Sequence, residues 1–446
     1  MSVVKRVEKN AGTKFLSTVA ERNMRILVFN SGSSSLKFQL FKMDANAPAS
    51  MLQGTVRDLG DETTCEWAYA GKKHSKSLDL NDHDEAVRYV LDLLENCTDG
   101  GQSLLDGVTA IGHRIVHGGR AFIAPALITE RMLSALEVLS PLAPLHNPPA
   151  LAVVRACRAR LANVPMVAVF DTAFFQDLPD YVHTYALPAE WIKRPQGIRR
   201  YGFHGLAHRY MSERYSAIND VAPTSSRLIT LQLGHGCSVA AIHGGRPMET
   251  SMGFTPMEGL IMATRPGDVD IGAVLHLLEH GIVTASKLSD GLNHHSGLLG
   301  LSGVSDDMQT LLVLEAQGHA GARLAVQAFC HRARKYIGAY LAVLGGADAI
   351  IFGGGIGEQA AEIRQRICVG MEWCGLVLDT QANQMTVGVE ACISMADSQT
   401  QAYVIPVDEE SLIAQDTLNC LNPEVTSDFH FSTLQVGKGY ESNVKY

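Results

Sequence analysis

The nine cysteines include no CxxC pair, and no apolar run approaches the roughly 20 residues of a membrane-spanning helix. A secreted disulfide scaffold would be shorter and denser in cysteine, so we expect reduced thiols in a cytoplasm. The net charge of −9 argues against a general nucleic-acid-binding protein, because such binding needs a basic face. We therefore expect a cytoplasmic protein that neither crosses a membrane nor binds nucleic acid.

The chain of 446 residues exceeds what one hydrophobic core usually supports, so we expect two domains. Residues 1–23 are charged throughout and lack the apolar core of a secretory signal, which favours an extension before the first strand. Residues 422–446 are polar and are expected to form a surface tail. The 41 glycines indicate many tight turns and close backbone approaches.

Residues 26–40, ILVFNSGSSSLKFQL, predict two strands joined by a small polar turn. In the second strand Leu36, Phe38 and Leu40 alternate with polar residues, which is typical of a strand with one buried face. The turn offers backbone N–H groups and hydroxyls to an anion, and Lys37 adds a positive charge beside it. A phosphate group is the expected ligand, although a plain polar hairpin has the same pattern.

The pattern of strand, glycine turn and strand returns at residues 228–242, LITLQLGHGCSVAAI. A second half that restarts the first motif predicts a duplicated fold, with each half on one side of a cleft. A third glycine-rich segment, residues 353–358, lies in a predicted loop between a buried strand and a helix, where free N–H groups suit an anion. It matches neither the P-loop, which needs G-K-[ST], nor G-x-G-x-x-G.

Further polar residues follow predicted strands. A short strand in residues 108–119 delivers Arg114 to a Gly-Gly turn, and three prolines in residues 142–149 predict a rigid loop that presents His146 and Asn147. Such positions indicate the walls of a cleft.

Two residues are candidates from their positions. Asp171 follows a fully buried strand, and the carboxyl ends of such strands are where α/β proteins place chemistry. Arg265 lies on a loop bounded by Gly and Pro, where we expect it to face Arg114 across the cleft.

Two histidine pairs have the i, i+4 spacing that binds zinc on a helix, namely His113 with His117 and His204 with His208. No Glu accompanies them in an H-E-x-x-H pattern and both pairs lie at turns, so we expect hydrogen bonding instead of metal binding. Cys237, in the second glycine turn, is expected to be a small filler beside the backbone.

A series of motifs runs from residue 26 to about residue 415 in the order NSGSSSLKF, GHRIVHGG, LAPLHNP, FDTAFF, RRYGFHG, LGHGCS, TPMEGLIMATRPGD, FGGGIGE and VDEE. Together they closely resemble the acetate kinase family, also called the acetate and propionate kinases. The resemblance implies an α/β protein with the duplicated, two-lobed fold of sugar kinases, Hsp70 and actin, a ribonuclease H-like fold with a central cleft. It also implies a homodimer that transfers the γ-phosphoryl group of ATP to acetate with Mg²⁺, or with Mn²⁺ in its place.

The family's fold predicts how the chain divides. Residues 24–173 are expected to form the first lobe, joined by a C-terminal helix at about residues 409–421. Residues 174–408 are expected to form the second, nucleotide-binding lobe.

The resemblance also implies roles for single residues. Asn30 and Glu409 resemble the magnesium positions. Asp171 resembles an essential aspartate that donates or accepts a proton, although holding an arginine or Mg²⁺ in place is an equally good role. His204 and Arg265 resemble the residues that stabilise the transition state. The predicted catalytic residues are Asp171, His204 and Arg265, and the predicted substrate-binding residues are Arg114, Val116 and His146.

The nucleotide positions that the resemblance implies are Lys37, Gln232, Leu233, Gly234, His235, Gly236, Asp307, Met308, Gln309, Gly355, Ile356, Gly357, Glu358 and Gln359. Here the chain departs from the family. The family commonly reads HLGNG, DFR and GIGEN, and this chain reads QLGHG, DMQ and GIGEQ. Because these segments would surround the donor, GTP or pyrophosphate stays open as an alternative to ATP.

Three other functions are alternatives to this one. Propionate is the alternative acceptor, because one methylene changes discrimination by only about 1–3 kcal/mol. A sugar kinase would need a hydroxyl acceptor and a general base. A non-catalytic module like actin or Hsp70 would have no reason to keep Arg114, Asp171, His204 and Arg265 together.

Overall fold

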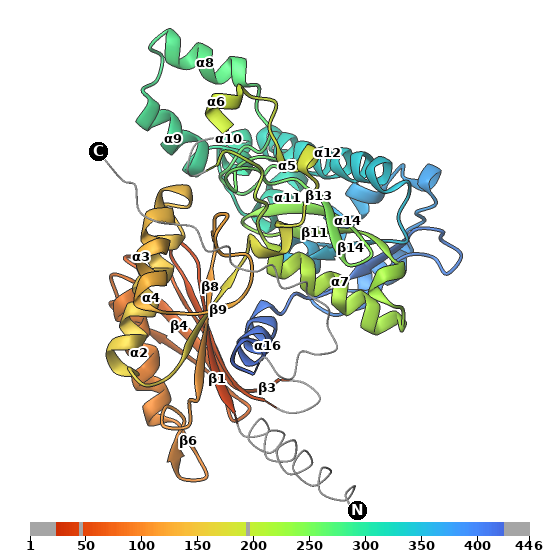
Figure 1. Ribbon diagram of the computed structural model, residues 1–446. Coiled ribbons are helices and arrows are strands. Elements are labelled where there is room, and N and C mark those ends of the chain that lie inside the picture. The colour runs from red at the N-terminus through yellow and green to blue at the C-terminus, as the bar shows by residue number, and fades with distance from the viewer. Residues whose placement is uncertain (1–23, 44–47, 193–196, 423–446) are drawn as a thin grey trace, which may run out of the picture.

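The computed structural model describes residues 24–43, 48–192 and 197–422, so the predicted N-terminal extension and nearly all of the predicted tail lie outside the described residues. Two β-sheets form the centres of two lobes (Figure 1). No helix in the described ranges is long and apolar enough to cross a membrane.

In the described residues the first sheet has eight strands in the order β5-β4-β3-β2-β1-β8-β10-β9. Their bounds are β1 Arg25–Ser31, β2 Leu36–Lys42, β3 Ala49–Arg57, β4 Thr64–Tyr69, β5 Lys72–Ser77, β8 Ala110–Ile115, β9 Ala126–Leu127 and β10 Met166–Phe170. The second sheet, also counted over the described ranges, has six strands in the order β13-β12-β11-β14-β16-β15. These are β11 Arg227–Leu233, β12 Cys237–His243, β13 Arg246–Thr250, β14 Ala349–Gly353, β15 Ala391–Cys392 and β16 Gln401–Val404.

Both sheets repeat one topology. Three consecutive strands pair antiparallel, β1-β2-β3 in the first sheet and β11-β12-β13 in the second. The first strand of each set pairs in parallel with a later strand, β8 or β14, and that strand pairs in parallel with another, β10 or β16. The duplication predicted from the two glycine turns is therefore confirmed.

Helices cover both faces of the first sheet (Figure 1). On one face lie α2 (His83–Asn96), α3 (Glu130–Leu139) and α4 (Asn147–Arg160), and α4 packs against β1 and β8. On the other face α16 (Glu409–Leu421) contacts β1, β8 and β10 and packs against α7 (Gly205–Asn219). The last described helix thus returns to the first sheet, although it follows the strands of the second.

The remaining helices of the second lobe are α8 Ile271–Glu279, α9 Ala285–His294, α10 Gly297–Ser302, α11 Met308–Ala316, α12 Ala320–Leu344, α13 Gly354–Gln359, α14 Ala361–Cys368 and α15 Thr380–Met385. Short elements are β6 Thr98–Asp99, β7 Gln102–Ser103, α5 Asp180–His183, α6 Ala189–Ile192 and the 3₁₀ helices Ser140–Leu142, Ala173–Phe175, Pro223–Ser225 and Glu372–Cys374. Helix α12 ends at Gly345, whose φ of 66° is a conformation that glycine adopts without strain.

Two expected loops are helical. Asn147 begins α4 instead of standing on a rigid loop, since prolines fit the first turn of a helix, where their missing N–H groups would be unpaired anyway. The third glycine segment forms the short helix α13 instead of an open loop before a helix. Its Gly354 has a φ of 75° and packs so closely on β11 that a Cβ there would lie 2.6 Å from the carbonyl oxygen of Leu233.

Candidate active site

Arg114, in β8, is the centre of a charged cluster at the carboxyl ends of the parallel strands of the first sheet. Its Nη2 lies 2.5 Å from Oδ2 of Asp171, which follows β10. Its Nη1 donates to Oδ1 of Asn30 in β1 over 3.2 Å, and its Nε lies 4.0 Å from Oε2 of Glu409. Three strands and α16 therefore meet at one guanidinium group.

Asn30 connects this cluster to two neighbouring glutamates of α16. Its Nδ2 donates to Oε2 of Glu409 over 2.8 Å and to Oε1 of Glu410 over 2.9 Å. The Nζ atom of Lys37 lies 3.8 Å from the same Glu410 oxygen. Burial raises the pKa of Glu410, and Lys37 opposes this shift. Our sequence reasoning missed Glu410, for which the only signal was its place beside Glu409 in VDEE.

Asp171 is fully buried, and its second oxygen, Oδ1, has no hydrogen-bond partner among the described residues. Burial by itself lowers the pKa of the Arg114 guanidinium, but the carboxylates of Asp171 and Glu409 outweigh burial and raise it. The pair is therefore held as an ion pair, with one carboxylate oxygen of Asp171 left open.

His204 comes from the second lobe and has strained backbone. With φ 56° and ψ 31° it adopts the left-handed conformation, which is uncommon for a residue other than glycine and which clusters at functional sites. The next residue starts α7 and must be small, because a Cβ on Gly205 would lie 2.0 Å from the carbonyl oxygen of Asp171. This close approach brings His204 to the Asp171 segment.

Arg265 meets His204 at the second glycine turn. A Cβ built on Gly236 would lie 2.8 Å from Nη2 of Arg265 and 3.3 Å from Nε2 of His204. Arg265 donates from Nη1 to the carbonyl of Pro256, and burial lowers its pKa. In the described ranges, unlike Arg114, it has no carboxylate within ion-pair distance. Its charge is therefore free to attract an anion.

Positive charges from both lobes lower the pKa of His146. Its pKa falls to about 3, first through burial and then through the positive charges of Arg114 and Arg265. The pKa of His204 likewise falls to about 3 through burial, Arg114 and Arg265. The positive charges of both arginines therefore disfavour protonation of these two histidines.

The strand that carries Arg114 continues into an apolar wall. Val116 is buried in one hydrophobic cluster with Tyr201 and Phe203 of the second lobe. His117 lies edge-on to these two rings, with centroids 4.4 and 5.6 Å away. Asn147 exchanges hydrogen bonds of 3.1 and 3.0 Å with the backbone N–H and carbonyl of His117. This wall can contact a small apolar group beside Arg114.

The predicted nucleotide segments also converge. A Cβ on Gly234 would lie 3.9 Å from the backbone nitrogen of Gly355, and Nε2 of His235 lies 3.7 Å from Asp306, next to Asp307. Asp307 caps α11 by accepting from Thr310 N over 2.7 Å. Glycine turn, α11 and α13 thus surround one region.

Several residues predicted to bind the nucleotide have side chains that contact other parts of the protein. Leu233 and Met308 are buried in the hydrophobic core of the second lobe. The carboxylate of Glu358 accepts from Gly354 N over 2.8 Å and from Val407 N over 3.2 Å. The side chains of these residues are therefore engaged within the protein.

The two histidine pairs differ in their hydrogen bonding. His204 and His208 do form hydrogen bonds, both to the hydroxyl of Ser238. For His113 the expectation of hydrogen bonding is wrong, since both ring nitrogens are buried and unpaired among the described residues. Its side chain stacks on Phe29 in the core instead. The described part of the chain contains no group of three or more His, Cys, Asp or Glu residues arranged to hold a metal ion.

Cys237 is the small filler that we expected in the second glycine turn. Its thiol donates to the carbonyl of Gly234 over 3.2 Å, and burial raises its pKa to about 12.

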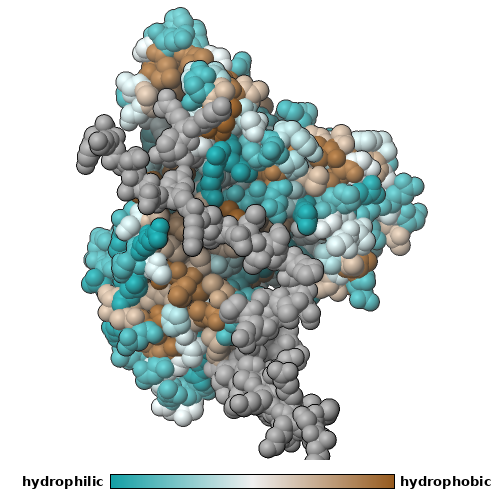
Figure 2. Space-filling view, in the orientation of Figure 1, coloured by the Kyte–Doolittle hydropathy of each residue, from teal (hydrophilic) through white to brown (hydrophobic). Residues whose placement is uncertain are grey.

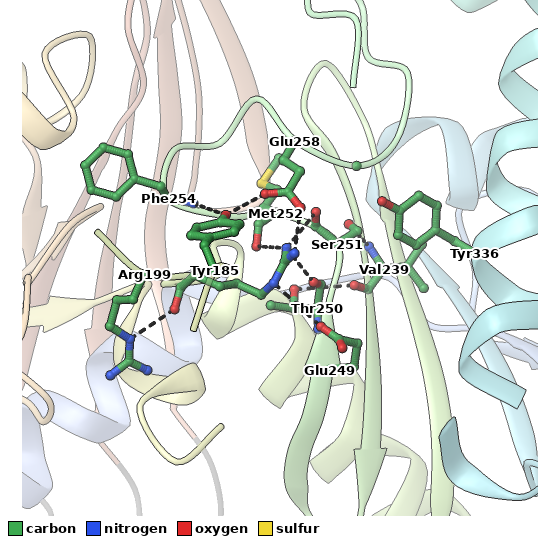
Figure 3. Close-up of polar contacts among 12 residues, drawn as sticks. Tyr185, Arg199, Val239, Glu249, Thr250, Ser251, Met252, Phe254, Glu258 and Tyr336 are labelled. Atoms are coloured by element: carbon green, nitrogen blue, oxygen red, sulfur yellow. Dashed lines mark hydrogen bonds and ion pairs between the residues drawn. The ribbon is translucent and has the colours of Figure 1, made fainter. Parts of the chain in front are cut away.

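The segment that carries Arg265 is held by a second charged cluster (Figure 3). Nη1 of Arg200 donates to three successive carbonyls at the end of β13 and beyond, over 3.1 to 3.3 Å, and Nη2 lies 2.5 Å from Oε1 of Glu258. Tyr185 donates to Oε2 of Glu258 over 2.5 Å and accepts from Phe254 N over 2.9 Å. The sequence patterns do not predict this role for Arg200, for which the only signal is its place beside the YGFHG motif.

Comparisons with known proteins agree with this geometry. The model of the acetokinase family matches residues 25–415. The chain is 44% identical over 400 residues to an acetate kinase of Bacteroides thetaiotaomicron, covering 89% of this chain and all of the relative. It is 45% identical over 410 residues to an acetate kinase of Solibacter usitatus, covering 89% and 98%.

Two solved structures are also similar to this chain over most of its length. The acetate kinase of Porphyromonas gingivalis superposes with a TM-score of 0.81 at 39% identity, covering 89% of this chain and 100% of that one. A propionate kinase from Francisella tularensis superposes with a TM-score of 0.81 at 35% identity, covering 89% and 99%. These likenesses confirm the predicted duplicated α/β fold.

Proposed function

The chain belongs to the acetokinase family, and we propose that it transfers the γ-phosphoryl group of ATP to acetate, giving ADP and acetyl phosphate. One observation carries the proposal. Arg114 of the first lobe is paired with Asp171, whose backbone packs against Gly205 beside His204, and Arg265 of the second lobe meets His204 at Gly236, so two cations approach one region from opposite lobes. That arrangement suits a carboxylate and a phosphoryl group that react with each other.

The chemistry needs charge neutralisation more than proton transfer. A carboxylate oxygen of acetate attacks the γ-phosphorus, and the bond from that phosphorus to the bridging oxygen breaks, leaving its electron pair on ADP. No proton has to be removed from the acceptor, so positioning and electrostatic stabilisation supply most of the acceleration. We assign Arg114 to the acetate carboxylate, and Arg265 and His204 to the transferring phosphoryl group.

In this mechanism Asp171 positions Arg114 instead of acting as a base. The support is its ion pair of 2.5 Å with Arg114 and its complete burial. Val116 and its aromatic neighbours would contact the methyl group of acetate. Because one methylene changes discrimination by only about 1–3 kcal/mol, propionate remains the alternative acceptor.

We propose Asn30 and Glu409 as the residues that hold Mg²⁺, or Mn²⁺ in its place. Their oxygens suit this ion, and the unpaired Oδ1 of Asp171 adds a buried acceptor nearby. Mg²⁺ is usually bound through one or two carboxylates together with substrate phosphates, so a small set of protein ligands fits it. When bound, the ion neutralises negative charge on the phosphate groups.

We also propose a homodimer formed through α8. None of its nine residues is buried, although the helix is strongly apolar, with Ile271 at 70% and Leu275 at 48% exposure. With α9 it projects from the second lobe, where Figure 2 shows hydrophobic residues at the surface. A second copy of the chain would cover this helix. A cytoplasmic location is a further prediction, supported by nine cysteines that are all free thiols.

A hydroxamate assay tests the function. The purified chain is incubated with acetate, propionate, butyrate or glucose and with ATP, GTP or pyrophosphate, and hydroxylamine traps any acyl phosphate. We expect acetate with ATP to give the most hydroxamate. Pyrophosphate or GTP as the better donor would revise the donor alone, whereas no hydroxamate from any carboxylate and donor would overturn the proposal.

A further inference from the structure

A line of buried polar side chains leads from the second sheet to His204. Thr230 Oγ1, in β11, lies 2.7 Å from Nδ1 of His208, and Nε2 of His208 lies 2.8 Å from Oγ of Ser238 in β12. The same Ser238 oxygen lies 2.8 Å from Nδ1 of His204. Thr230, His208 and Ser238 are completely buried, so these bonds are shielded from bulk solvent.

Each of the three contacts needs one proton. If Ser238 accepted from both rings, its own hydroxyl hydrogen would have no acceptor among the described residues, so the line can run in only two directions. A hydroxyl donates one hydrogen bond, and a neutral imidazole has one N–H group. Both rings are neutral, because burial keeps the pKa of His204 and of His208 well below its ordinary value. Running toward the site, Thr230 donates to His208, His208 donates from Nε2 to Ser238, and Ser238 donates to Nδ1 of His204. The proton of His204 is then on Nε2.

The hydroxyl of Thr230, at the end of the line farthest from His204, decides the direction in which the hydrogen bonds run. In the reverse arrangement Thr230 would accept from His208, and its own hydroxyl hydrogen would need another acceptor. Among the described residues Thr230 Oγ1 has His208 as its one partner, and a buried hydroxyl without an acceptor is destabilising. The arrangement that leaves no donor unpaired is the one that runs toward His204.

We propose that Thr230, His208 and Ser238 are positioning residues that hold His204 in the tautomer with its proton on Nε2. That nitrogen lies at the second glycine turn beside Arg265, where a Cβ on Gly236 would come within 3.3 Å of it. The inference rests on the proposed function, because a donor at Nε2 stabilises negative phosphoryl oxygens and a bare nitrogen repels them. In this proposal the three residues do not touch the substrate, and they determine which ring nitrogen of His204 carries the proton.

Two substitutions at Thr230 separate this role from packing. Thr230→Val keeps the side-chain volume and removes the hydroxyl, whereas Thr230→Ser keeps the hydroxyl and removes a methyl group. Without the hydroxyl the two directions become similar in energy, so kcat should fall to about half, in proportion to the competent population, with KM for acetate unchanged. Thr230→Ser should keep the wild-type kcat. The opposite order, with serine damaged and valine intact, would show a packing role and overturn the proposal.

The tautomer itself is read by NMR of protein labelled with ¹⁵N-histidine. Long-range ¹H–¹⁵N correlations identify which ring nitrogen carries the proton, and His204→Gln assigns the His204 signals among the 17 histidines. We expect a protonated Nε2 in the wild type and in Thr230→Ser, and a mixture in Thr230→Val. A wild-type His204 with its proton on Nδ1 would overturn the inference.

The NMR measurement does not depend on activity, so failure of the inference and failure of the proposed function are distinguishable. A protonated Nε2 in a chain that makes no acyl phosphate leaves the hydrogen-bond line correct and the kinase wrong. Ser238→Ala offers a second variant if Thr230→Val fails to fold. It removes the last bond of the line, and we expect kcat to fall about fivefold and Nδ1 of His204 to lose its donor. An unchanged kcat in Ser238→Ala would count against the proposal.

Discussion

At the scale of single residues, the two arginines of the site differ in their partners. Arg114 is paired with a buried carboxylate and is also bonded to Asn30, whereas Arg265 is buried with a backbone carbonyl as its hydrogen-bond acceptor. A paired guanidinium group is held in a fixed place, and an unpaired one attracts an anion strongly. We infer that Arg114 orients the acceptor and that Arg265 draws in the phosphoryl group.

We predict that Arg114→Ala raises KM for acetate roughly 10- to 100-fold, because a hydrogen bond to a charged group contributes about 1.5–3 kcal/mol. It should also lower the free energy of unfolding by about 3–5 kcal/mol, since Asp171 is left buried without its partner. Steady-state kinetics and urea denaturation measure the two effects. Arg114→Lys is the control that keeps the charge, and an unchanged acetate saturation in Arg114→Ala would remove this residue from the site.

His113 gives a prediction for pH. Its side chain is 1% exposed and burial lowers its pKa to about 3 from the ordinary 6.5, so the unfolded chain takes up a proton that the folded chain does not. Stability from the neutral ring is complete above pH 6.5 and is lost as the pH falls toward 3. His113→Phe should therefore reduce the loss of unfolding free energy between pH 8 and pH 5 by about 2 kcal/mol.

The measurement is urea denaturation at both pH values. His331→Phe, at an exposed position of α12, is the matched control for replacing a histidine with phenylalanine. An equal pH dependence in His113→Phe and in the wild type would contradict the assignment.

At the scale of elements, the segment that carries Arg265 depends on contacts outside the site. Met262 and Ala263 bond to Arg265 O and His235 O, while Arg200 and Glu258 fix the stretch before them. Downstream, the hydroxyl of Tyr336 shares its one hydrogen between the two carboxylate oxygens of Asp268, which lie 3.0 and 2.9 Å away. A loop with polar contacts at both ends holds its arginine at low entropic cost.

We predict that Tyr185→Phe lowers kcat about fivefold with little change in KM for acetate, because it removes one hydrogen bond to Glu258 and one from Phe254. Hydrogen exchange in residues 252–268 should become faster. Tyr181, which is 83% exposed, supplies the matched control, and Tyr181→Phe should change neither quantity. Equal kcat values for Tyr185→Phe and the wild type would show that this cluster does not support Arg265.

At the scale of the whole molecule, α16 and α7 pack against each other between the two sheets. Asp416 of α16 accepts from Arg209 of α7 over 2.8 and 2.9 Å, and Asp416 is nearly completely buried. The helix that contributes Glu409 to the first lobe is therefore bonded to the helix that begins beside His204. This contact links the two halves of the site.

We predict that Leu275→Glu dissociates the proposed dimer, because a charge at a covered apolar position is strongly unfavourable. Size-exclusion chromatography with light scattering should report half the wild-type mass. Val343, exposed to 49% on α12, is the control position, and Val343→Glu should leave the mass unchanged. A wild-type monomer, or a dimer that tolerates Leu275→Glu, would contradict the interface.

Local patterns in the sequence were enough to predict the strands, the two glycine turns and the duplication, because alternation and glycine act within a few residues. They failed at Asn147 and at Gly354, where packing turned an expected loop into a helix. They also predicted hydrogen bonding for His113, whereas β8 turns its side chain into the core, where it stacks on Phe29.

The tertiary structure decided which side chains of the site are bonded to each other. Asn30 meets Glu409 across 379 residues of sequence, and Glu410 joins them because the first turn of α16 turns both carboxylates toward β1. The line from Thr230 to His204 likewise depends on the packing of α7 against β11, although the spacing of His204 and His208 and the pairing of β11 with β12 are local. A hydrogen bond depends on the distance and direction between two atoms, and for residues far apart in sequence only the packed fold sets these quantities.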